Sequence, residues 1–174
     1  YRWALEQGYD FIFRCDDERG RAMVNFIQTH QQVLQTLQER TEYKVSAVLL
    51  SDYDKGTLTP KFISDVIRMC KDRHIPCVAD VKQAPEVYEG CILKCNSDYQ
   101  HKHNDGLCDH LKNGYLIVTA GALNPIVWDN GPPTELGYDL PPVPCINHVG
   151  AGDCFAAHLT LALAHRFTLS EASA

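Results

Sequence analysis

A turn of small residues ahead of a helical pattern carries the residues best suited to chemistry in this sequence. The turn spans residues 149–153 and reads Val-Gly-Ala-Gly-Asp, and residues 154–164 continue it as a run of small and apolar residues. The first N–H groups of a helix lack intrahelical partners and lie at the positive end of the helix dipole. The amides of Gly150, Ala151 and Gly152 are therefore suited to hold an anion such as a phosphate. Asp153 would stand beside that anion as a base for a hydroxyl proton.

Two common phosphate-binding motifs do not describe this turn. The dinucleotide fingerprint G-x-G-x-x-G fails because Phe155 stands where its third glycine would be, and no G-x-x-x-x-G-K-[ST] sequence occurs in the chain. An ordinary strand-to-helix turn is the alternative interpretation. In that case the glycines would only allow close packing and Asp153 would cap the helix.

Composition limits the classes of function. The 174 residues carry 16 Lys+Arg and 22 Asp+Glu, a formal net charge of −6, and 45% of them are hydrophobic. This is typical of a soluble globular domain or part of one, without the basic surface of a nucleic-acid-binding protein. No apolar run reaches the roughly 20 residues that a membrane span needs, and no signal peptide is recognisable. We therefore expect a cytoplasmic protein with reduced core thiols, among them Cys77, Cys91, Cys95, Cys145 and Cys154.

The elements that must position the turn follow from the hydrophobic pattern. Apolar runs predict strands at residues 11–14, 45–50, 75–80, 91–96, 115–119, 125–128 and 142–146. Helical periodicity marks residues 23–40 and 60–73, and Thr59 and Pro60 form a typical helix start for the second of these. Strands that alternate with helices predict an α/β fold, with a mainly parallel sheet covered on both faces. The last residues, from Ser170 as a cap, predict the start of another helix.

Polar residues follow several of these strands. Ligands of such sheets bind beyond the carboxyl ends of the strands. We therefore expect one edge of the sheet to gather the following residues: Asp52, Lys55, Asp80, Lys94, Asn96, Thr119, Gly121 and the turn at 150–153.

Four segments, in this order along the chain, resemble the ribokinase-like sugar kinases, a family that includes the B-type phosphofructokinases. Residues 50–58 resemble a Ser-Asp-Tyr-x-Lys-Gly-x-Leu segment, and residues 94–96 a Lys-Pro-Asn segment. Residues 118–121 are similar to a Thr-x-Gly nucleotide segment, and residues 149–155 to the Gly-Ala-Gly-Asp signature. The first segment, together with residues 14–18, is typical of the heptose 7-phosphate kinase branch of ADP-heptose synthesis. The resemblance covers most of the chain.

The resemblance implies a three-layer ribokinase-like fold of which residues 1–174 are the C-terminal part, incomplete at both ends. It implies that Asp153 activates a sugar hydroxyl while the amides of residues 150–152 hold the transferring phosphoryl group. Lys94 would lie near the phosphates of ATP, and Asn96 would help to order Mg²⁺. The resemblance also implies that Thr119 and Gly121 line the nucleotide. Asp52 and Lys55 are candidates to contact a substrate phosphate or a sugar hydroxyl, and a strand-end loop with a local ion pair is the alternative. Arg14 is a further substrate candidate, for which an exposed charged turn is the favoured interpretation.

Two positions depart from the family pattern. Tyr99 stands where the family usually has a glutamate that supports magnesium, and Asp98 lies one position before it. Asn124 replaces a glycine common in the nucleotide segment. Direct metal ligands are therefore not identified by the sequence.

Histidines and cysteines offer two further interpretations. His101, His103, Cys108 and His110 are of the types that zinc prefers, but their spacing lacks the paired rhythm of a structural zinc site, which favours a solvated loop. His148 precedes the glycine turn and is a second candidate base, less well placed than Asp153.

The sequence thus predicts ATP-dependent phosphoryl transfer to a sugar or sugar phosphate, with heptose 7-phosphate as one acceptor. A ribokinase- or fructokinase-type acceptor is an alternative. A non-catalytic nucleotide- or sugar-binding protein derived from the kinase fold is another, motivated by Tyr99. The expected partners are small molecules, without nucleic acid or membrane. The sequence permits a homodimer but does not determine the oligomeric state.

Overall fold

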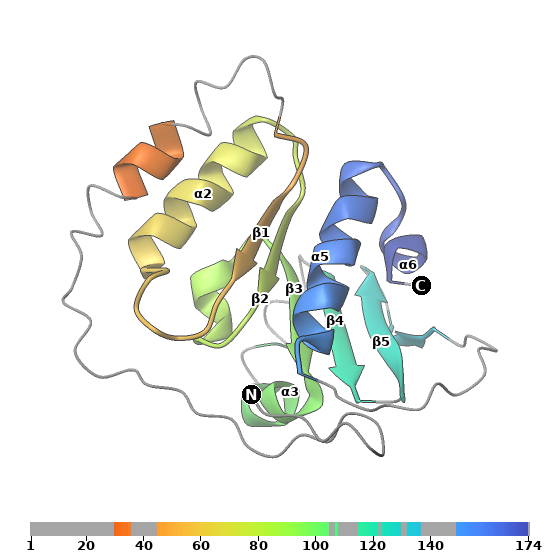
Figure 1. Cartoon of the computed structure of the whole chain (residues 1–174). Coiled ribbons are helices and arrows are strands. Elements are labelled where there is room, and N and C mark those ends of the chain that lie inside the picture. The colour runs from red at the N-terminus through yellow and green to blue at the C-terminus, as the bar shows by residue number, and fades with distance from the viewer. Residues whose placement is uncertain are drawn as a thin grey trace, which may run out of the picture.

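A single six-stranded sheet organises the chain (Figure 1). The computed structural model describes residues 30–35, 45–104, 107, 115–121, 123–129, 132–136 and 149–173, and the structural statements below concern these residues. The strands lie in chain order as β1 (Val48–Ser51), β2 (Cys77–Asp80), β3 (Ile92–Asn96), β4 (Tyr115–Ala120), β5 (Leu123–Asp129) and β6 (Thr134–Glu135). The predicted strands at 11–14 and 142–146 lie outside the described residues.

The direction of the strands reverses at β5 and again at β6. Strands β1 to β4 are parallel, as predicted, whereas β5 is antiparallel to β4 and β6 is antiparallel to β5. Only residues 121 and 122 separate β4 from β5, which is long enough for a hairpin but too short for the crossover that a parallel partner needs. Gly121 has a φ of 61° in this hairpin, a left-handed conformation that glycine adopts without strain. The sheet is therefore mainly parallel, with an antiparallel edge.

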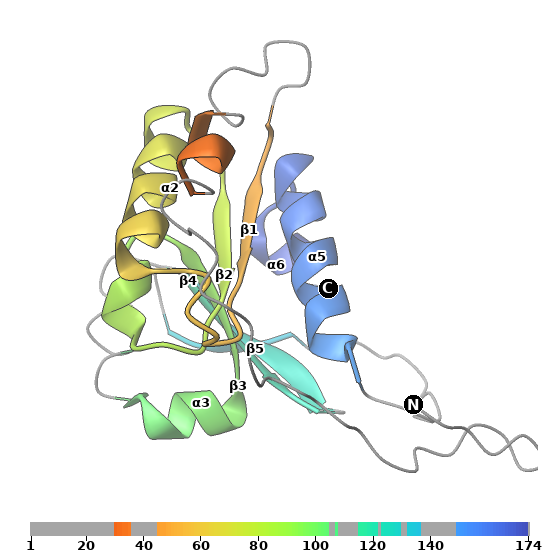
Figure 2. The same ribbon diagram turned by 60° about the vertical axis from the view of Figure 1, so that its left-hand side comes forward.

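Helices cover both faces of the sheet (Figure 2). Helix α2 (Pro60–Asp72) and the short 3₁₀ helix η1 (Pro85–Tyr88) lie on one face, while α5 (Ala151–Ala164) and α6 (Leu169–Ala172) lie on the other. A further short helix, α3 (Ser97–Lys102), follows β3 directly, and residues 30–35 of the predicted 23–40 helix are also helical. This arrangement is the predicted three-layer α/β fold.

The sheet separates two apolar clusters, because successive side chains of a strand point to opposite faces. Leu93 and Cys95 of β3 pack on the α2 side together with Ile63 and Val66 of that helix. Ile92 of β3 and Ile117 of β4 pack on the α5 side together with Leu159. The same alternation places Ser51, Asp80, Lys94 and Thr119 on the α5 side at the carboxyl ends of their strands.

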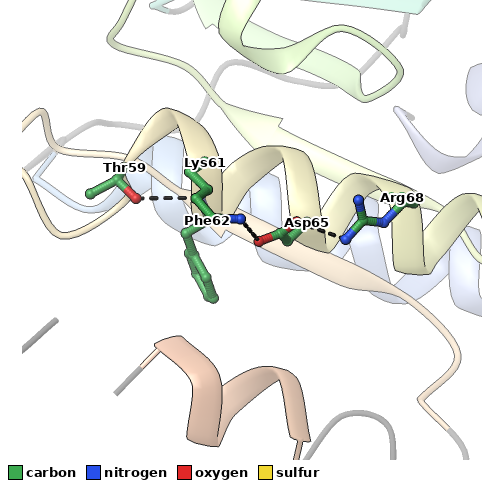
Figure 3. Close-up of polar contacts among 5 residues, drawn as sticks. All are labelled: Thr59, Lys61, Phe62, Asp65 and Arg68. Atoms are coloured by element: carbon green, nitrogen blue, oxygen red, sulfur yellow. Dashed lines mark hydrogen bonds and ion pairs between the residues drawn. The ribbon is translucent and has the colours of Figure 1, made fainter. Parts of the chain in front are cut away.

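Helix α2 confirms the start predicted from its sequence (Figure 3). The hydroxyl of Thr59 accepts a hydrogen bond from the N–H of Phe62 at 3.3 Å, and Pro60 occupies the first helical position. On the outer surface, the carboxylate of Asp65 accepts from Lys61 at 3.0 Å and from Arg68 at 2.8 Å. Such exposed pairs each add only about 0.2–0.5 kcal/mol. The buried apolar face of the helix therefore does most to hold it on the sheet.

Two details differ from the sequence predictions. Helix α6 begins at Leu169 with Thr168 as its cap, not at Ser170, because Thr168 and Glu171 bond reciprocally in a capping box. Cys77, Cys91 and Cys95 are buried free thiols, as expected, but Cys154 is exposed on the outer side of α5. Cys145 lies outside the described residues. None of the helices in the described residues combines the length and apolar composition needed to cross a membrane.

Candidate phosphoryl-transfer site

The glycine turn starts α5 as the sequence predicts. Gly150 is the N-cap residue and has a φ of 83°, a left-handed conformation that strains most other residues. The first intrahelical bond runs from the N–H of Cys154 to the carbonyl oxygen of Gly150 at 2.9 Å. The amides of residues 151–153 therefore have no partner within the helix. Asp153 makes no cap bond, so the interpretation of this residue as a helix cap is wrong.

Lys94 lies next to this first turn. A Cβ atom added at Gly152 would lie 3.0 Å from the Nζ atom of Lys94, which is about as close as such atoms can come. Only 4% of Lys94 is exposed, so its charge is held beneath the turn and not in open solvent. The absence of a side chain at Gly152 is what lets the lysine approach the bare amides. A positive charge and free N–H groups thus share one place, which suits an anionic ligand.

Asp80 holds Lys94 there. Its Oδ2 atom lies 3.1 Å from Nζ of Lys94, and the two residues are direct neighbours in the parallel register of β2 and β3. Asp80 is 6% exposed, and its second oxygen, Oδ1, is buried without a hydrogen-bond partner in the described part of the chain. A buried, unpaired carboxylate oxygen is costly unless a proton, a cation or a polar ligand group satisfies it. A cation that accompanies phosphates is one group that would satisfy this oxygen.

Asp153 has a partner from the loop that follows β1. The hydroxyl of Tyr53 donates a 2.7 Å hydrogen bond to Oδ1 of Asp153, although the two residues are 100 positions apart in the sequence. Both side chains are exposed, so the carboxylate can be reached by a ligand. The hydrogen bond to Asp153 and partial burial raise the pKa of Tyr53 above its ordinary value. The hydroxyl therefore keeps its proton and acts as a donor at neutral pH.

Asp52 does not share this surface. It is 3% exposed, and its Oδ2 atom accepts hydrogen bonds from the hydroxyl of Tyr88 and from Nε2 of Gln83, the latter at 2.7 Å. Its Oδ1 atom accepts from the N–H of Asp54 at 2.7 Å. Both oxygens are thus engaged on the α2 side of the sheet, away from Asp153. Lys55 follows in the same loop and is exposed. Their predicted contact with a sugar stays a prediction.

The predicted nucleotide residues meet at one edge of the sheet. Asn96 and Thr119 are direct neighbours in the register of β3 and β4, two positions beyond Lys94 and before the hairpin at Gly121. The side chain of Asn96 caps α3 by accepting from the N–H of Tyr99 at 2.9 Å, and the hydroxyl of Thr119 donates to the carbonyl oxygen of Cys95 at 3.2 Å. Their nucleotide roles stay predictions.

Tyr99, at the position of the family glutamate, is part of the core. It is 8% exposed and donates a 2.5 Å hydrogen bond to the carbonyl oxygen of Gln83, and its ring stacks on His103. Burial raises the pKa of its hydroxyl well above the ordinary value. Tyr99 therefore ties α3 to the loop after β2 and provides no carboxylate for a metal.

Sequence reasoning missed two partners in this site. Tyr53 lies within the recognised 50–58 segment, but its contact with Asp153 depends on how that loop folds. Asp80 appeared only as a strand-end residue, although it and Lys94 occupy equivalent positions in adjacent parallel strands. The sequence did not show this register, because the predicted strands 75–80 and 91–96 end at Asp80 and at Asn96.

Four candidate residues from the sequence analysis are not among the described residues. Arg14, Cys108, His110 and His148 lie outside the described residues. No group of three His, Cys, Asp or Glu side chains that could hold a metal ion occurs in the part of the chain that the structure describes.

Comparisons with known proteins bear on the fold. No protein-family model matches the chain. The bifunctional protein HldE of Actinobacillus succinogenes is 27% identical over 162 residues, which is 85% of this chain and 34% of that protein. The structure of Arabidopsis thaliana ribokinase complexed with ribose and ATP superposes with a TM-score of 0.63 and 17% identity, over 82% of this chain and 49% of the ribokinase. A point mutant of phosphofructokinase-2 from Escherichia coli gives a TM-score of 0.62 and 18% identity, over 85% of this chain and 52% of that enzyme.

The chain spans about a third of the length of the curated relative and about half of these solved structures. The chain therefore has the ribokinase-like fold, and the resemblance of its sequence to the ribokinase-like carbohydrate kinases is confirmed.

Proposed function

We propose that the chain carries the phosphoryl-transfer site of an ATP-dependent carbohydrate kinase. The observation that supports this most strongly is the convergence at the start of α5: free amides, the Lys94 ammonium beside Gly152, and the accessible carboxylate of Asp153 in the same turn. One of these groups binds a phosphate, one neutralises its charge and one accepts a proton. Phosphoryl transfer from ATP to a hydroxyl uses all three.

In this reaction the hydroxyl of a sugar attacks the γ-phosphorus of ATP while the bond to the β–γ bridging oxygen breaks. Asp153 takes the hydroxyl proton as the new oxygen–phosphorus bond forms. The amides at the start of α5 and the Lys94 ammonium stabilise the negative charge on the transferring group. A magnesium ion on the ATP phosphates would supply further neutralisation, and Asp80, with its unpaired Oδ1 atom, is the residue that would hold it.

Asp153→Asn tests the proposal directly. The variant keeps the size of the side chain but cannot accept the proton, so we expect turnover to fall about 100-fold or more while ATP binding changes little. Asp129→Asn is a matched control, because Asp129 pairs with Tyr115 at the opposite edge of the sheet. Near-normal turnover in Asp153→Asn, measured as sugar-dependent ADP release, would overturn the proposal.

The acceptor we propose is a sugar phosphate of the heptose 7-phosphate type. The support is the 50–58 segment together with the similarity to HldE. ADP release measured with heptose 7-phosphate, ribose and fructose 6-phosphate, at equal concentrations, distinguishes this acceptor from a ribokinase or fructokinase type. A higher kcat/KM for either of the latter two would contradict the heptose assignment and leave the phosphoryl-transfer chemistry intact.

A non-catalytic nucleotide-binding protein is the second candidate. It is favoured by Tyr99, which provides no carboxylate, and by Asn96, whose side chain already caps α3. Calorimetry with ATP, with and without magnesium, separates the candidates when combined with the ADP-release assay. Magnesium-dependent ATP binding without sugar-stimulated ADP release would support this second function.

A further inference from the structure

The loop that follows β1 reaches across to the first turn of α5. Its only exposed aromatic residue among those described, Tyr53, places its hydroxyl 2.7 Å from Oδ1 of Asp153. The other carboxylate oxygen of Asp153, Oδ2, receives no hydrogen bond from the described residues. One oxygen of the proposed base is thus anchored by the chain, while the other is open to a ligand.

The backbone around Tyr53 is anchored by buried residues on the α2 side of the sheet. Its neighbour Asp52 is buried, and the carboxylate of Asp52 accepts hydrogen bonds from Gln83 and Tyr88 on the far side of the sheet. The N–H of Asp54 closes a tight turn on Oδ1 of Asp52 at 2.7 Å, and Gln83 also donates to the carbonyl oxygen of Leu58 at 3.0 Å. The backbone on each side of Tyr53 is therefore tied to the core, and this sets where its ring can point.

We propose that Tyr53 is a positioning residue for Asp153. Its hydroxyl holds Oδ1 of the carboxylate and so orients Oδ2 toward the acceptor hydroxyl of the substrate. This inference rests on the proposed function, because it assigns Asp153 the role of base.

The chemical reason is orientation. An exposed aspartate can rotate about its side-chain bonds, and proton transfer needs one oxygen aimed at the hydroxyl. A fixed donor on the other oxygen removes most of that freedom. The alternative is that the hydrogen bond between Tyr53 and Asp153 only links the loop after β1 to helix α5 and has no effect on the reaction.

A titration of the Tyr53 phenol tests the contact without any assay of activity. The hydrogen bond to Asp153 is the largest cause of the raised pKa of Tyr53, followed by burial and by the charges of Asp153 and Asp80, while Ser51 lowers it. These residues, from α5, β2 and β1, are the groups that act on the phenol. Asp153→Ala is therefore expected to lower the pKa of Tyr53.

The pH-dependent tyrosinate absorbance of the wild type minus that of Tyr53→Phe gives the titration of the Tyr53 phenol alone. The same subtraction in the Asp153→Ala background gives the Tyr53 pKa without the carboxylate and completes a double-mutant cycle. Tyr115→Phe is the matched control, since it makes the same change at the amino end of β4, away from the site. A Tyr53 pKa that is the same with and without the Asp153 carboxylate would overturn the proposed contact.

Kinetics then separate positioning from a structural tie. Tyr53→Phe keeps the ring and removes only the hydroxyl, so we expect kcat to fall about tenfold with little change in the KM for ATP, whereas Tyr115→Phe keeps normal values. An unchanged kcat in Tyr53→Phe would overturn the positioning role. If the wild-type chain released no ADP but the pKa of Tyr53 still depended on the Asp153 carboxylate, the proposed function would be refuted. The hydrogen bond between Tyr53 and Asp153 would still be supported.

Discussion

The ammonium of Lys94 lies 3.1 Å from Oδ2 of Asp80, in a pair that is almost completely buried beside the first turn of α5. The pair joins two neighbouring strands at the edge where the glycine turn begins. Its geometry connects stability to the proposed function, because the carboxylate that pairs with the lysine also holds it beside the first turn of α5.

Asp80→Asn is expected to destabilise the fold. Removal of one partner of a buried ion pair leaves the other charge uncompensated, at a cost of about 3–5 kcal/mol in the free energy of unfolding. Urea unfolding measures this cost. Lys94→Met in the Asp80→Asn background should recover most of it, since no unpaired charge then remains.

Asp65→Asn is the control for that experiment. Asp65 forms its ion pairs on the surface of α2, where such a pair is worth about 1 kcal/mol or less. Equal losses of stability in Asp80→Asn and Asp65→Asn would contradict the buried character of the Asp80–Lys94 pair.

Gly152→Ala should separate function from stability. The new methyl group would lie 3.0 Å from Nζ of Lys94, so the lysine must move away from the amides. Alanine is about 1 kcal/mol better than glycine within a helix, which offsets part of the strain. We expect weaker ATP binding by calorimetry with a free energy of unfolding close to that of the wild type.

A change at the exposed face of the same helix controls for helix propensity. Ala157→Gly should lower the free energy of unfolding by about 1 kcal/mol and leave ATP binding unchanged. If Gly152→Ala bound ATP as tightly as the wild type, the placement of Lys94 beneath the turn would have no functional meaning.

Tyr88→Phe tests whether Asp52 is structural. Tyr88 is completely buried, and its hydroxyl donates to Oδ2 of Asp52, so its removal leaves a buried acceptor with one donor fewer. The expected loss is about 1–3 kcal/mol in the free energy of unfolding, with an unchanged KM for the sugar. A raised KM with normal stability would instead support direct contact of this network with the substrate.

Alkaline pH should destabilise the protein. Burial raises the pKa of the Cys95 thiol from its ordinary value of 9.0 to about 12, and the pKa values of the buried Cys70 and Cys77 are raised as well. The folded state keeps these protons while the unfolded state releases them. The stabilisation is therefore complete below pH 9.0 and is lost as the pH rises toward 12.

For each such thiol the loss is about 1.4 kcal/mol per pH unit within that range. Urea unfolding at a series of pH values measures it, and Cys95→Ala should reduce the slope between pH 9.0 and 12. The same slope in the variant and the wild type would show that Cys95 is ionised as readily in the folded protein as in the unfolded chain.

Local patterns in the sequence determined most elements of this fold. The helix start at Thr59 and Pro60 depends on contacts within one turn, and the strand at residues 91–96 depends on a continuous apolar run; both are present in the structure. The helix start at the glycine turn was also recognisable, because glycines and an aspartate ahead of a helical pattern are typical of helix starts. The expectation that Lys94 lies near the glycine turn needed only the rule that ligands of parallel sheets bind beyond the carboxyl ends of the strands.

Only the tertiary structure decided which of those edge residues face one another. Asp52 and Asp80 both come at the ends of apolar runs, yet Asp52 lies on the α2 side of the sheet and Asp80 on the α5 side. The register pairs Asp80 with Ser51, so Asp52 lies one residue further along its strand. Because successive side chains point to opposite faces, Asp52 and Asp80 point to different sides. The hydrogen bond between Tyr53 and Asp153 joins residues 100 positions apart, and no local sequence pattern predicts a contact between residues so far apart in the chain. Its geometry depends on the packing of α5 against β1 and β2, which is a property of the whole sheet.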